Sequence, residues 1–250
     1  MTLKKLISAV IVFALVLCTL TSCDLFGGKS EEKAEELVAE AEAALKNQPY
    51  SIDMKVKYAS NDEGMKNALS FFADPEIKVV VNGGDFKIGM ELMKGGLSEY
   101  YTYTLFGGKL YSEYQYGDYR SCNELEYGAG TVEAIRSTLG AGANVSEEDF
   151  KSLSVNTSED VTVVTYTEIN DEALSKLVAF LQEQLTDANA LVTIKNVSLV
   201  VEIVDGKYDV TALECEYHIT TIDSVYTLKM TFTAKFNYEG DFTITAPELG

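Results

Sequence analysis

Apolar and polar residues alternate in several separate stretches of the chain. In residues 50–58 every second side chain is apolar, and the side chains between them are polar or charged. The same alternation occurs in residues 86–92, 197–203, 213–219 and 226–236. An alternation with period two is typical of a strand that buries one face and leaves the other in water. The pattern therefore predicts a sheet with one apolar face.

Paired glycines recur every twelve residues from residue 83 to residue 108. They are Gly83-Gly84, Gly95-Gly96 and Gly107-Gly108, and a Gly117-Asp118 pair follows them. Glycine adopts the positive φ angles that tight hairpins need. We therefore expect consecutive antiparallel strands joined by short turns, and Asp205-Gly206 predicts a further hairpin. Residues 161–169 and a final segment, residues 242–247, are also expected to be strands.

Two longer stretches have helical spacing instead. Apolar residues recur at helical intervals in residues 31–47, and again after Asn170 or Asp171 as far as residue 188. Residues 146–149 resemble a capping box, which predicts another helix after them. Helices that cross a large antiparallel sheet define an α+β fold. Because a large twisted sheet curls, we expect the helices on its concave face, where they either pack solidly or leave an apolar cavity.

The first 22 residues have the three parts of an export signal. Lys4 and Lys5 precede an apolar run in residues 6–20, which is short for a spanning helix because such a helix needs about 20 apolar residues. The sequence Leu-Thr-Ser-Cys at 20–23 is similar to the lipobox of bacterial lipoproteins. That resemblance implies cleavage between Ser22 and Cys23 and lipidation of Cys23 as a diacylglyceryl cysteine with fatty acyl chains such as palmitate. The alternatives are an ordinary secretory signal cut elsewhere and an uncleaved anchor.

These features predict the organisation of the chain and its location. Residues 1–22 would be the signal, residues 23–30 a flexible tether with two glycines, and residues 31–250 one domain. Two or more acyl chains give stable anchoring, so we expect a cell-membrane protein that is lipid-anchored on the extracytoplasmic face. Asp24 is similar to an inner-membrane retention signal of Gram-negative lipoproteins. It has no such meaning in Gram-positive bacteria, and the sequence leaves both contexts open.

The net negative charge of the chain limits the classes of molecule that it can bind. The whole chain has a formal net charge of −19, and loss of Lys4 and Lys5 with the signal makes the mature charge −21. Such a surface repels nucleic acid and anionic head groups, so we expect no nucleic-acid partner. The lipid on Cys23 would then be the contact with the membrane. The sequence does not identify a protein partner.

The chain has four cysteines, of which two remain as free candidates after export. Cys18 would leave with the signal, and Cys23 would be acylated. Cys122 and Cys215 could form a disulfide in the oxidising space outside the cytoplasm. The alternative is a pair of buried thiols that act as small hydrophobic side chains.

Catalytic patterns are not found in the sequence. His218 is the only histidine, and its strand phase places it on the solvated face, which does not favour a histidine triad. The mature chain has no zinc-type cluster, calcium loop or phosphate-binding glycine loop, so we predict no metal, no cofactor and no enzymatic activity. The tyrosine-rich strands around residues 100–116 favour either an exposed aromatic surface for a sugar or protein partner, or simply the preference of tyrosine for strands.

The order of elements resembles that of the LolA-like and LppX-like bacterial lipoproteins. A first helix, a strand at 50–58, a meander with glycine pairs, central helices and long closing hairpins cover residues 31–250. The resemblance implies a half-open β-barrel with a helical lid that holds acyl chains or another lipid. The candidate pocket lining consists of Met54, Val56, Ile88, Met90, Leu177, Leu181, Leu228, Met230 and Phe232.

The sequence thus predicts a membrane-anchored lipoprotein that binds a lipid or another hydrophobic ligand. Methionine side chains would provide an adaptable lining for such a ligand. The alternative is an envelope protein without a bound ligand, which has a structural or protein-interaction role and no enzymatic activity.

Overall fold

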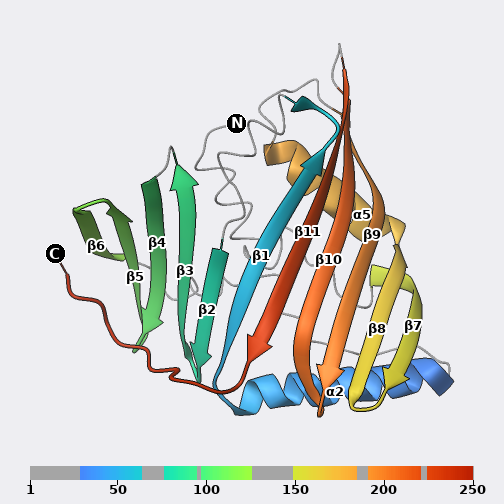
Figure 1. Cartoon of the computed structure of the whole chain (residues 1–250), viewed down its shortest axis with the longest axis horizontal. Helices are drawn as coiled ribbons and strands as arrows, with labels where there is room; N and C mark the ends of the chain where they lie inside the picture. The colour runs from blue at the N-terminus through green and yellow to red at the C-terminus, as the bar shows by residue number, and fades with distance from the viewer. Residues whose placement is uncertain are drawn as a thin grey trace.

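The computed structural model describes residues 29–63, 76–94, 97–125, 149–184, 191–220 and 224–249 (Figure 1). Its strands form one antiparallel sheet with the order β6-β5-β4-β3-β2-β1-β11-β10-β9-β8-β7. Their bounds are β1 Tyr50–Ser60, β2 Glu76–Asn82, β3 Asp85–Lys94, β4 Leu97–Phe106, β5 Lys109–Tyr116, β6 Tyr119–Leu125, β7 Phe150–Ser158, β8 Val161–Ile169, β9 Leu191–Val204, β10 Lys207–Thr220 and β11 Val225–Asn237.

Two meanders build this sheet. Strands β1 to β6 follow one another toward one edge, β7 to β11 return from the other edge, and β11 pairs with β1 in the middle. Gly83, Gly107 and Gly117 have φ angles of 60°, 57° and 56°, which explains why glycine occupies these turns. The hairpins predicted at these positions are confirmed, as is the one at Asp205-Gly206. The pair at 95–96 lies outside the described residues.

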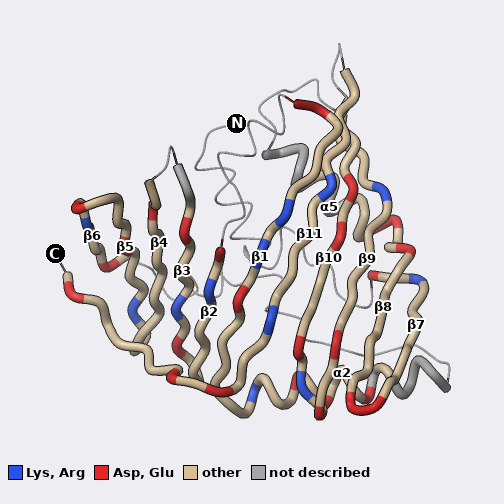
Figure 2. The backbone as a smooth tube through the Cα atoms, viewed as in Figure 1, with Lys and Arg blue, Asp and Glu red and all other residues tan. Residues whose placement is uncertain are grey.

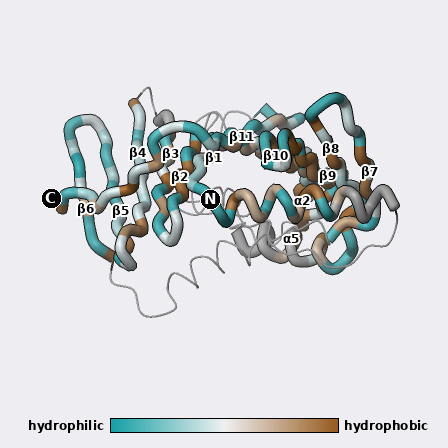
Figure 3. Tube along the Cα trace, turned by 90° about the horizontal axis from the view of Figure 1, so that it is seen from below, coloured by the Kyte–Doolittle hydropathy of each residue, from teal (hydrophilic) through white to brown (hydrophobic). Residues whose placement is uncertain are grey.

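Two helices lie on the same side of the sheet (Figure 3). They are α2, Lys29–Asn47, and α5, Asp171–Gln184. We call the sheet face toward them the inner face and the opposite one the outer face. The hydroxyl of Tyr208 on β10 donates to the carbonyl of Val38 at 3.5 Å, which ties α2 to the sheet. The amide of Ala173 donates to Oδ1 of Asn170 at 2.8 Å, so Asn170 caps α5 as predicted.

The buried core lies on the inner face. Val56 on β1 is opposite Phe232 on β11, and Phe232 is opposite Leu213 on β10. All three side chains are almost fully buried. The alternation in the sequence correctly predicts which side of each of these strands is inside, because a register shift by one residue would expose the whole apolar set.

The predicted α+β class is wrong. The described chain is nearly all sheet, with eleven antiparallel strands in one open sheet and two helices of 19 and 14 residues. The edge strands β6 and β7 lie at opposite ends of the strand order, so the sheet is open and is not the expected half-open barrel crossed by amphipathic helices. The physical reason is that the alternating segments are longer and more numerous than the helical ones, and sheet pairing orders nearly every one of them.

Two local predictions are also wrong. Residues that follow the capping-box pattern at 146–149 form strand β7, an edge strand rich in serine and threonine, and not a helix. The predicted final strand at 242–247 is an irregular segment. There Asp241 accepts hydrogen bonds from the amide and the hydroxyl of Thr243, and such side-chain bonds compete with strand pairing.

None of the helices among the described residues is both long enough and apolar enough to cross a membrane. The signal, the tether as far as residue 28, and Cys23 lie outside the described residues. Residues 65–72 and 131–139, where the sequence pattern indicates a helical turn and a short helix, also lie outside the described residues.

Candidate functional site

The predicted pocket lining lies on the inner face. Met54 on β1 is opposite Ile77 on β2, and Ile77 is opposite Met90 on β3. These side chains therefore form one continuous row across three strands. Of the nine predicted lining residues, Met54, Val56, Ile88, Met90 and Phe232 are buried, and Leu228 and Met230 are partly buried against the same core. Leu177 and Leu181 belong to α5, but their side chains are not described.

Thr211 places a small buried hydroxyl group on this apolar face, which also holds the tyrosines Tyr58, Tyr208 and Tyr217. Thr211 on β10 is opposite Ala234 on β11 and is 0% exposed. Its Oγ1 has no hydrogen-bond partner among the described parts of the chain. Buried polar groups normally have a partner in the protein or in ordered water, so this hydroxyl is an unusual feature of the lining.

A carboxyl group is buried on α2. Glu42 follows Ala41 on the side of α2 that faces the sheet, and its Oε2 lies 3.8 Å from Nζ of Lys46. Its Oε1 has no hydrogen-bond partner within the described ranges. Burial raises the pKa of Glu42, and the nearby charge of Lys46 lowers it by a smaller amount. The sequence analysis did not single out Glu42, although it is four residues after the buried Val38 and thus on the same side of the helix.

A second buried carboxyl group lies among tyrosines on β4. Glu99 is only 4% exposed. The hydroxyl of Tyr101 donates to its Oε2 at 3.1 Å, and the hydroxyl of Tyr114 on β5 donates to its Oε1 at 3.5 Å. The pKa of Tyr101 is raised, mainly because the hydroxyl is buried. The negative charge of Glu99 and the hydrogen bond to it raise this pKa further. The sequence analysis missed Glu99, but its phase, two residues before Tyr101, places it on the inner face.

The tyrosines around Glu99 come from three neighbouring strands. Tyr116 is opposite Glu99, and Tyr119 on β6 is opposite Tyr116. The ring centroids of Tyr101 and Tyr114 are 5.0 Å apart, and those of Tyr114 and Tyr119 are 6.1 Å apart. Tyr116 and Tyr119 are exposed. We call Glu99, Tyr101, Tyr114, Tyr116 and Tyr119 the tyrosine–glutamate cluster.

This cluster is continuous with the predicted lining. Tyr101 is opposite Met90 in the register of β3 and β4, and Glu99 is opposite Leu92. The inner face therefore changes from apolar side chains on β1 to β3 to hydroxyl groups and a carboxylate on β4 to β6. Such a surface could hold a molecule with an apolar part and a polar part.

Charged residues recur along the central strands (Figure 2), and the register of β10 with β11 places Glu216 and Lys229 together on the outer face. His218 lies there as predicted, with its Nε2 2.8 Å from Oε1 of Glu216, and Nζ of Lys229 is 3.3 Å from Oε2 of Glu216. The hydrogen bonds from His218 and Lys229 lower the pKa of Glu216. Among the described residues, no three His, Cys, Asp or Glu side chains lie close enough together to hold a metal ion.

The end of the chain runs past the lower ends of β2 to β4 and on beside β5 and β6 (Figure 1). Near the start of this C-terminal segment, residues 241–249, the side-chain amide of Asn82 on β2 donates to the carbonyl of Phe242 at 3.3 Å. Near its end, Glu248 interacts electrostatically with Arg120 on β6. Ile244 is buried, and so is Tyr111 on the outer face of β5.

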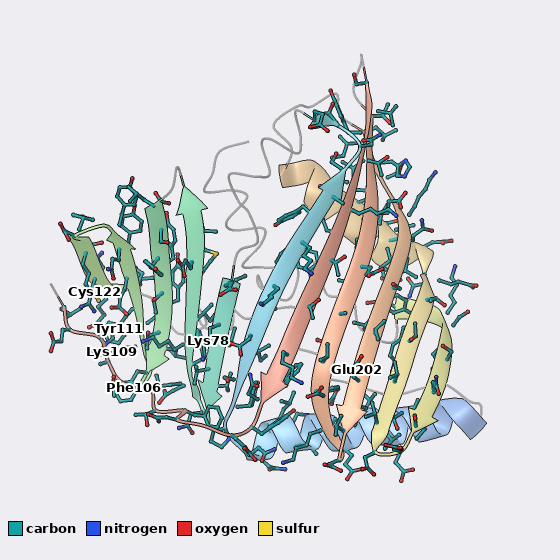
Figure 4. The ribbon with its side chains drawn as sticks, in the orientation of Figure 1. Lys78, Phe106, Lys109, Tyr111, Cys122 and Glu202 are labelled. Atoms are coloured by element: carbon teal, nitrogen blue, oxygen red, sulfur yellow. The ribbon has the colours of Figure 1, made fainter. Side chains whose placement is uncertain are left out.

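The structure does not bring the predicted cysteine pair together. Cys122 on β6 and Cys215 on β10 are buried free thiols with six strands between them. At about 4.8 Å per strand spacing they lie roughly 30 Å apart along the sheet, whereas a disulfide needs Cα atoms within about 7 Å. Figure 4 shows Cys122 near one edge of the sheet and Glu202 of β9 toward the other. Burial raises the pKa of Cys215 to about 12.

No family model and no curated protein matches the sequence. Among solved structures, the chain is similar over 83% of its length to 85% of the dehydratase domain of RzxB from Pseudomonas fluorescens, with 10% identity and a TM-score of 0.15. It is similar over 83% of its length to the whole of MucB in a complex with MucA(peri), with 9% identity and a TM-score of 0.13. A tesB protein of Mycobacterium avium subs paratuberculosis gives 12% identity, 90% and 99% coverage and a TM-score of 0.11. TM-scores this low do not establish a shared fold.

Proposed function

We propose that this protein is a membrane-anchored extracytoplasmic lipoprotein whose inner sheet face binds a lipid or another hydrophobic ligand. The observation that supports this most directly is the continuous row of apolar side chains from Met54 through Ile77 to Met90. Methionine side chains adapt to ligands of different shape because they are unbranched and polarizable. The order of elements, which resembles that of the LolA-like and LppX-like lipoproteins, supports the same class of ligand.

The buried hydroxyl of Thr211 agrees with this proposal. It lies on the inner face opposite Ala234 of β11, and Ala234 is in turn opposite Met54 of β1. A ligand with an ester, amide or hydroxyl group could accept or donate a hydrogen bond there. A purely structural core would be more stable with an apolar side chain of the same size at this position, because a buried hydroxyl without a partner costs about 1–3 kcal/mol.

Ligand binding can be tested by native mass spectrometry. The protein would be the whole mature chain, residues 23–250, with Cys23→Ser so that it is not acylated, purified without denaturant or detergent. We expect a population of the chain with an added mass that organic solvent extracts as a lipid. A chain of bare mass, with no extractable lipid from any host membrane and no binding of added long-chain lipids, would contradict the proposal.

Anchoring through Cys23 can be tested separately by labelling with radioactive palmitate. Cys23→Ala should abolish the label, because no other cysteine has the lipobox position. Cys18→Ala is the matched control, since Cys18 lies in the segment that the proposal assigns to the removed signal. Label that persists in Cys23→Ala, with the protein still firmly in the membrane fraction, would rule out the lipobox assignment.

A protein-interaction role is the second candidate. Leu97, Tyr100 and Tyr119 are large side chains with more than two fifths of their surface exposed, and all belong to β4 or β6. Exposed tyrosine is enriched at protein interfaces. If native mass spectrometry finds no lipid but a stable complex with another envelope protein, and Tyr119→Ala weakens that complex, this role replaces ligand binding.

A further inference from the structure

We infer that two copies of this chain pair through the edge of β6, so that their sheets continue into each other about a two-fold axis. The axis would pass through Cys122 at the middle of β6, and the two β6 strands would run antiparallel. This inference goes beyond the proposed function and does not depend on the ligand of the inner face. The partner is a second copy of the chain and not a different protein.

The first argument is that β6 can accept another strand. It is the last strand in the order of the sheet and pairs with β5 in a register without shifts. Its sequence, residues 119–125, contains no proline. An edge strand without proline or a bulge presents amide and carbonyl groups that can pair with a strand of another chain.

Among the described residues, neither a helix nor a strand occupies the edge beyond β6. Helix α2 contacts β7, β9 and β10, α5 contacts β9, and both lie toward the other end of the sheet (Figure 3). The C-terminal segment lies beside β6, but it is irregular and forms no ladder with that strand. The segment therefore does not take the place of a neighbouring strand.

The second argument is the charge pattern of β6. The strand has one cation, Arg120, and one anion, Glu124, which are placed symmetrically about Cys122. An antiparallel pair of β6 strands centred on Cys122 puts Arg120 of each copy directly opposite Glu124 of the other. Opposite charges in such positions stabilise a strand pair. The edge is thus complementary to itself, although the whole chain is strongly acidic.

Both charged groups can reach across the edge, because the side chains of Arg120 and Glu124 are 59% and 39% exposed. A guanidinium nitrogen of Arg120 lies 2.8 Å from Oε1 of Glu113, and Nζ of Lys109 lies 3.1 Å from Oε1 of Glu124. Each new pair would join Lys109 and Glu124 of one copy to Arg120 of the second copy, with the existing partners of that arginine, Glu113 and Glu248. A network of several charges stabilises a contact more than an isolated surface pair does.

The third argument comes from the inner side of the same strand. Tyr119 and Leu125 end β6 and are also symmetrical about Cys122, so each Tyr119 would lie opposite Leu125 of the second copy. Tyr119 is 61% exposed, and exposed tyrosine is enriched at protein interfaces. Only the register centred on Cys122 pairs all seven residues of β6, and it places no like charges opposite each other.

The other edge strand lacks this complementarity. Strand β7 has nine residues with Ser154 at the middle, and Lys151 is its one charged residue. The same two-fold operation would place Lys151 opposite Thr157, which is neutral. Charge complementarity therefore selects β6 over β7 as the contact.

The test uses charge reversal in the mature chain with Cys23→Ser, in a reducing buffer. Sedimentation velocity from about 1 to about 200 μM should show a monomer–dimer equilibrium of the parent chain. Arg120→Glu and Glu124→Arg should each weaken dimerisation about tenfold or more, because each variant places like charges opposite each other twice. A parent chain that remains monomeric over the whole range would overturn the inference.

Mixing the two variants gives a sharper result. In a dimer of one Arg120→Glu chain and one Glu124→Arg chain, both crossing pairs again combine opposite charges. An equimolar mixture should therefore dimerise about as well as the parent chain. Urea unfolding shows that each variant is folded before mixing. If the mixture of folded variants dimerises as weakly as each variant alone, the β6 contact is wrong even when the parent chain dimerises.

The matched control is Lys151→Glu, which changes the charge of the other edge strand by the same amount. Lys151 is exposed and pairs with Asp171 at 3.4 Å, so it is also the cation of a surface ion pair. This variant should change dimerisation less than about twofold, because the change lies far from β6 and is screened by salt. An equal loss in Lys151→Glu and Arg120→Glu would indicate general repulsion between acidic chains and would contradict the inference.

A second pair of variants tests the inner side of the contact. Tyr119→Ala should weaken dimerisation several-fold, because it removes the ring that packs on Leu125 of the second copy. Tyr116→Ala is the control, since Tyr116 is also exposed but lies on β5, one strand from the edge. It should change dimerisation less than about twofold. Equal effects of the two variants would contradict pairing through β6.

Discussion

The two halves of the sheet are covered in opposite ways. On β7 to β10 the helices α2 and α5 pack on the inner face, and the outer face carries ion pairs such as that of Lys235 with Asp209 at 2.6 Å. On β2 to β6 the C-terminal segment interacts with Asn82 and Arg120, which have the outward strand phase, and the inner face carries the tyrosine–glutamate cluster. The open sheet therefore has a helix-covered half and a tyrosine-rich half.

This difference explains the distribution of aromatic residues along the chain. In the helix-covered half a strict alternation is sufficient, because only one face is buried. In the tyrosine-rich half both faces of β4 and β5 need side chains that tolerate partial burial, and tyrosine has an apolar ring with a polar end. Tyr101 and Tyr114 thus face inward, while Tyr111 is buried on the outer face.

The largest effect is expected on β11, which pairs with β10 at the border of the helix-covered half. Phe232 is 1% exposed at the centre of the inner face. Phe232→Ala should lower the free energy of unfolding by about 3–5 kcal/mol, because it removes a ring from a packed core. Tyr119→Ala, on the same face of the other half but 61% exposed, should change it by less than about 0.5 kcal/mol. Urea unfolding measures both, and similar costs for the two variants would contradict the distinction between the halves.

A smaller and more local effect is expected when the C-terminal segment is loosened. Ile244→Ala should lower the free energy of unfolding by about 2 kcal/mol, at the low end for a buried isoleucine, because the segment can relax. It should also speed the reaction of Cys122 with a thiol reagent. Cys122 is on the outer face, two residues from Arg120, which interacts with Glu248.

Cys215 is the internal control for this experiment. It is buried on the inner face, and its pKa is raised to about 12, so its thiol should remain unreactive in both proteins at neutral pH. Equal acceleration of both thiols would indicate global unfolding. In that case the C-terminal segment would not be a separate cover of the tyrosine-rich half.

The smallest effect is a pH-dependent increase in the free energy of unfolding when Glu42 on α2 is replaced by glutamine. Because burial raises the pKa of Glu42 above its unfolded value, the folded state holds this proton more tightly, and stability falls as pH rises through the folded pKa. Gln is neutral at every pH. Glu42→Gln should therefore raise the free energy of unfolding at pH 7 by about 1 kcal/mol, and the gain should disappear below about pH 4.

Glu36→Gln is the control for that prediction, because Glu36 is exposed on the same helix. It should leave the pH dependence of unfolding nearly unchanged. A Glu42→Gln variant that is less stable at pH 7 would show that the carboxylate is stabilised by its surroundings and would sink the explanation by burial.

Local sequence patterns were sufficient to predict most strands, but they were not sufficient to predict which strands pair with each other. The inward phase of β1, β3, β10 and β11 follows from alternation, because each buries one face only. The pairing of β1 with β11 has no local signal, since it joins residues as far apart in the sequence as Ile52 and Phe236, which are 184 positions from each other. The α+β class was wrong because the alternating segments outweigh the two helical ones, and the capping pattern at 146–149 also suggested a helix where edge strand β7 forms.

The candidate site was predictable only in its apolar part. Met54 and Met90 have the phase of buried side chains, so the sequence could place them on one face. Glu42 and Glu99 were missed because a charged residue in a strongly acidic chain is normally expected in water. Their burial depends on neighbours from other elements, such as Tyr114 on β5 for Glu99, and these contacts are formed only when the sheet assembles.

The central claim, that the inner face binds a hydrophobic ligand, can be tested with single tryptophan reporters, because the chain contains no tryptophan. Tyr103→Trp places the reporter on the inner face opposite Ile88, and Tyr100→Trp places it on the outer face. A brominated long-chain fatty alcohol should quench the first reporter with saturation and leave the second nearly unchanged. Equal quenching of both reporters, or no quenching of Tyr103→Trp, would contradict the claim.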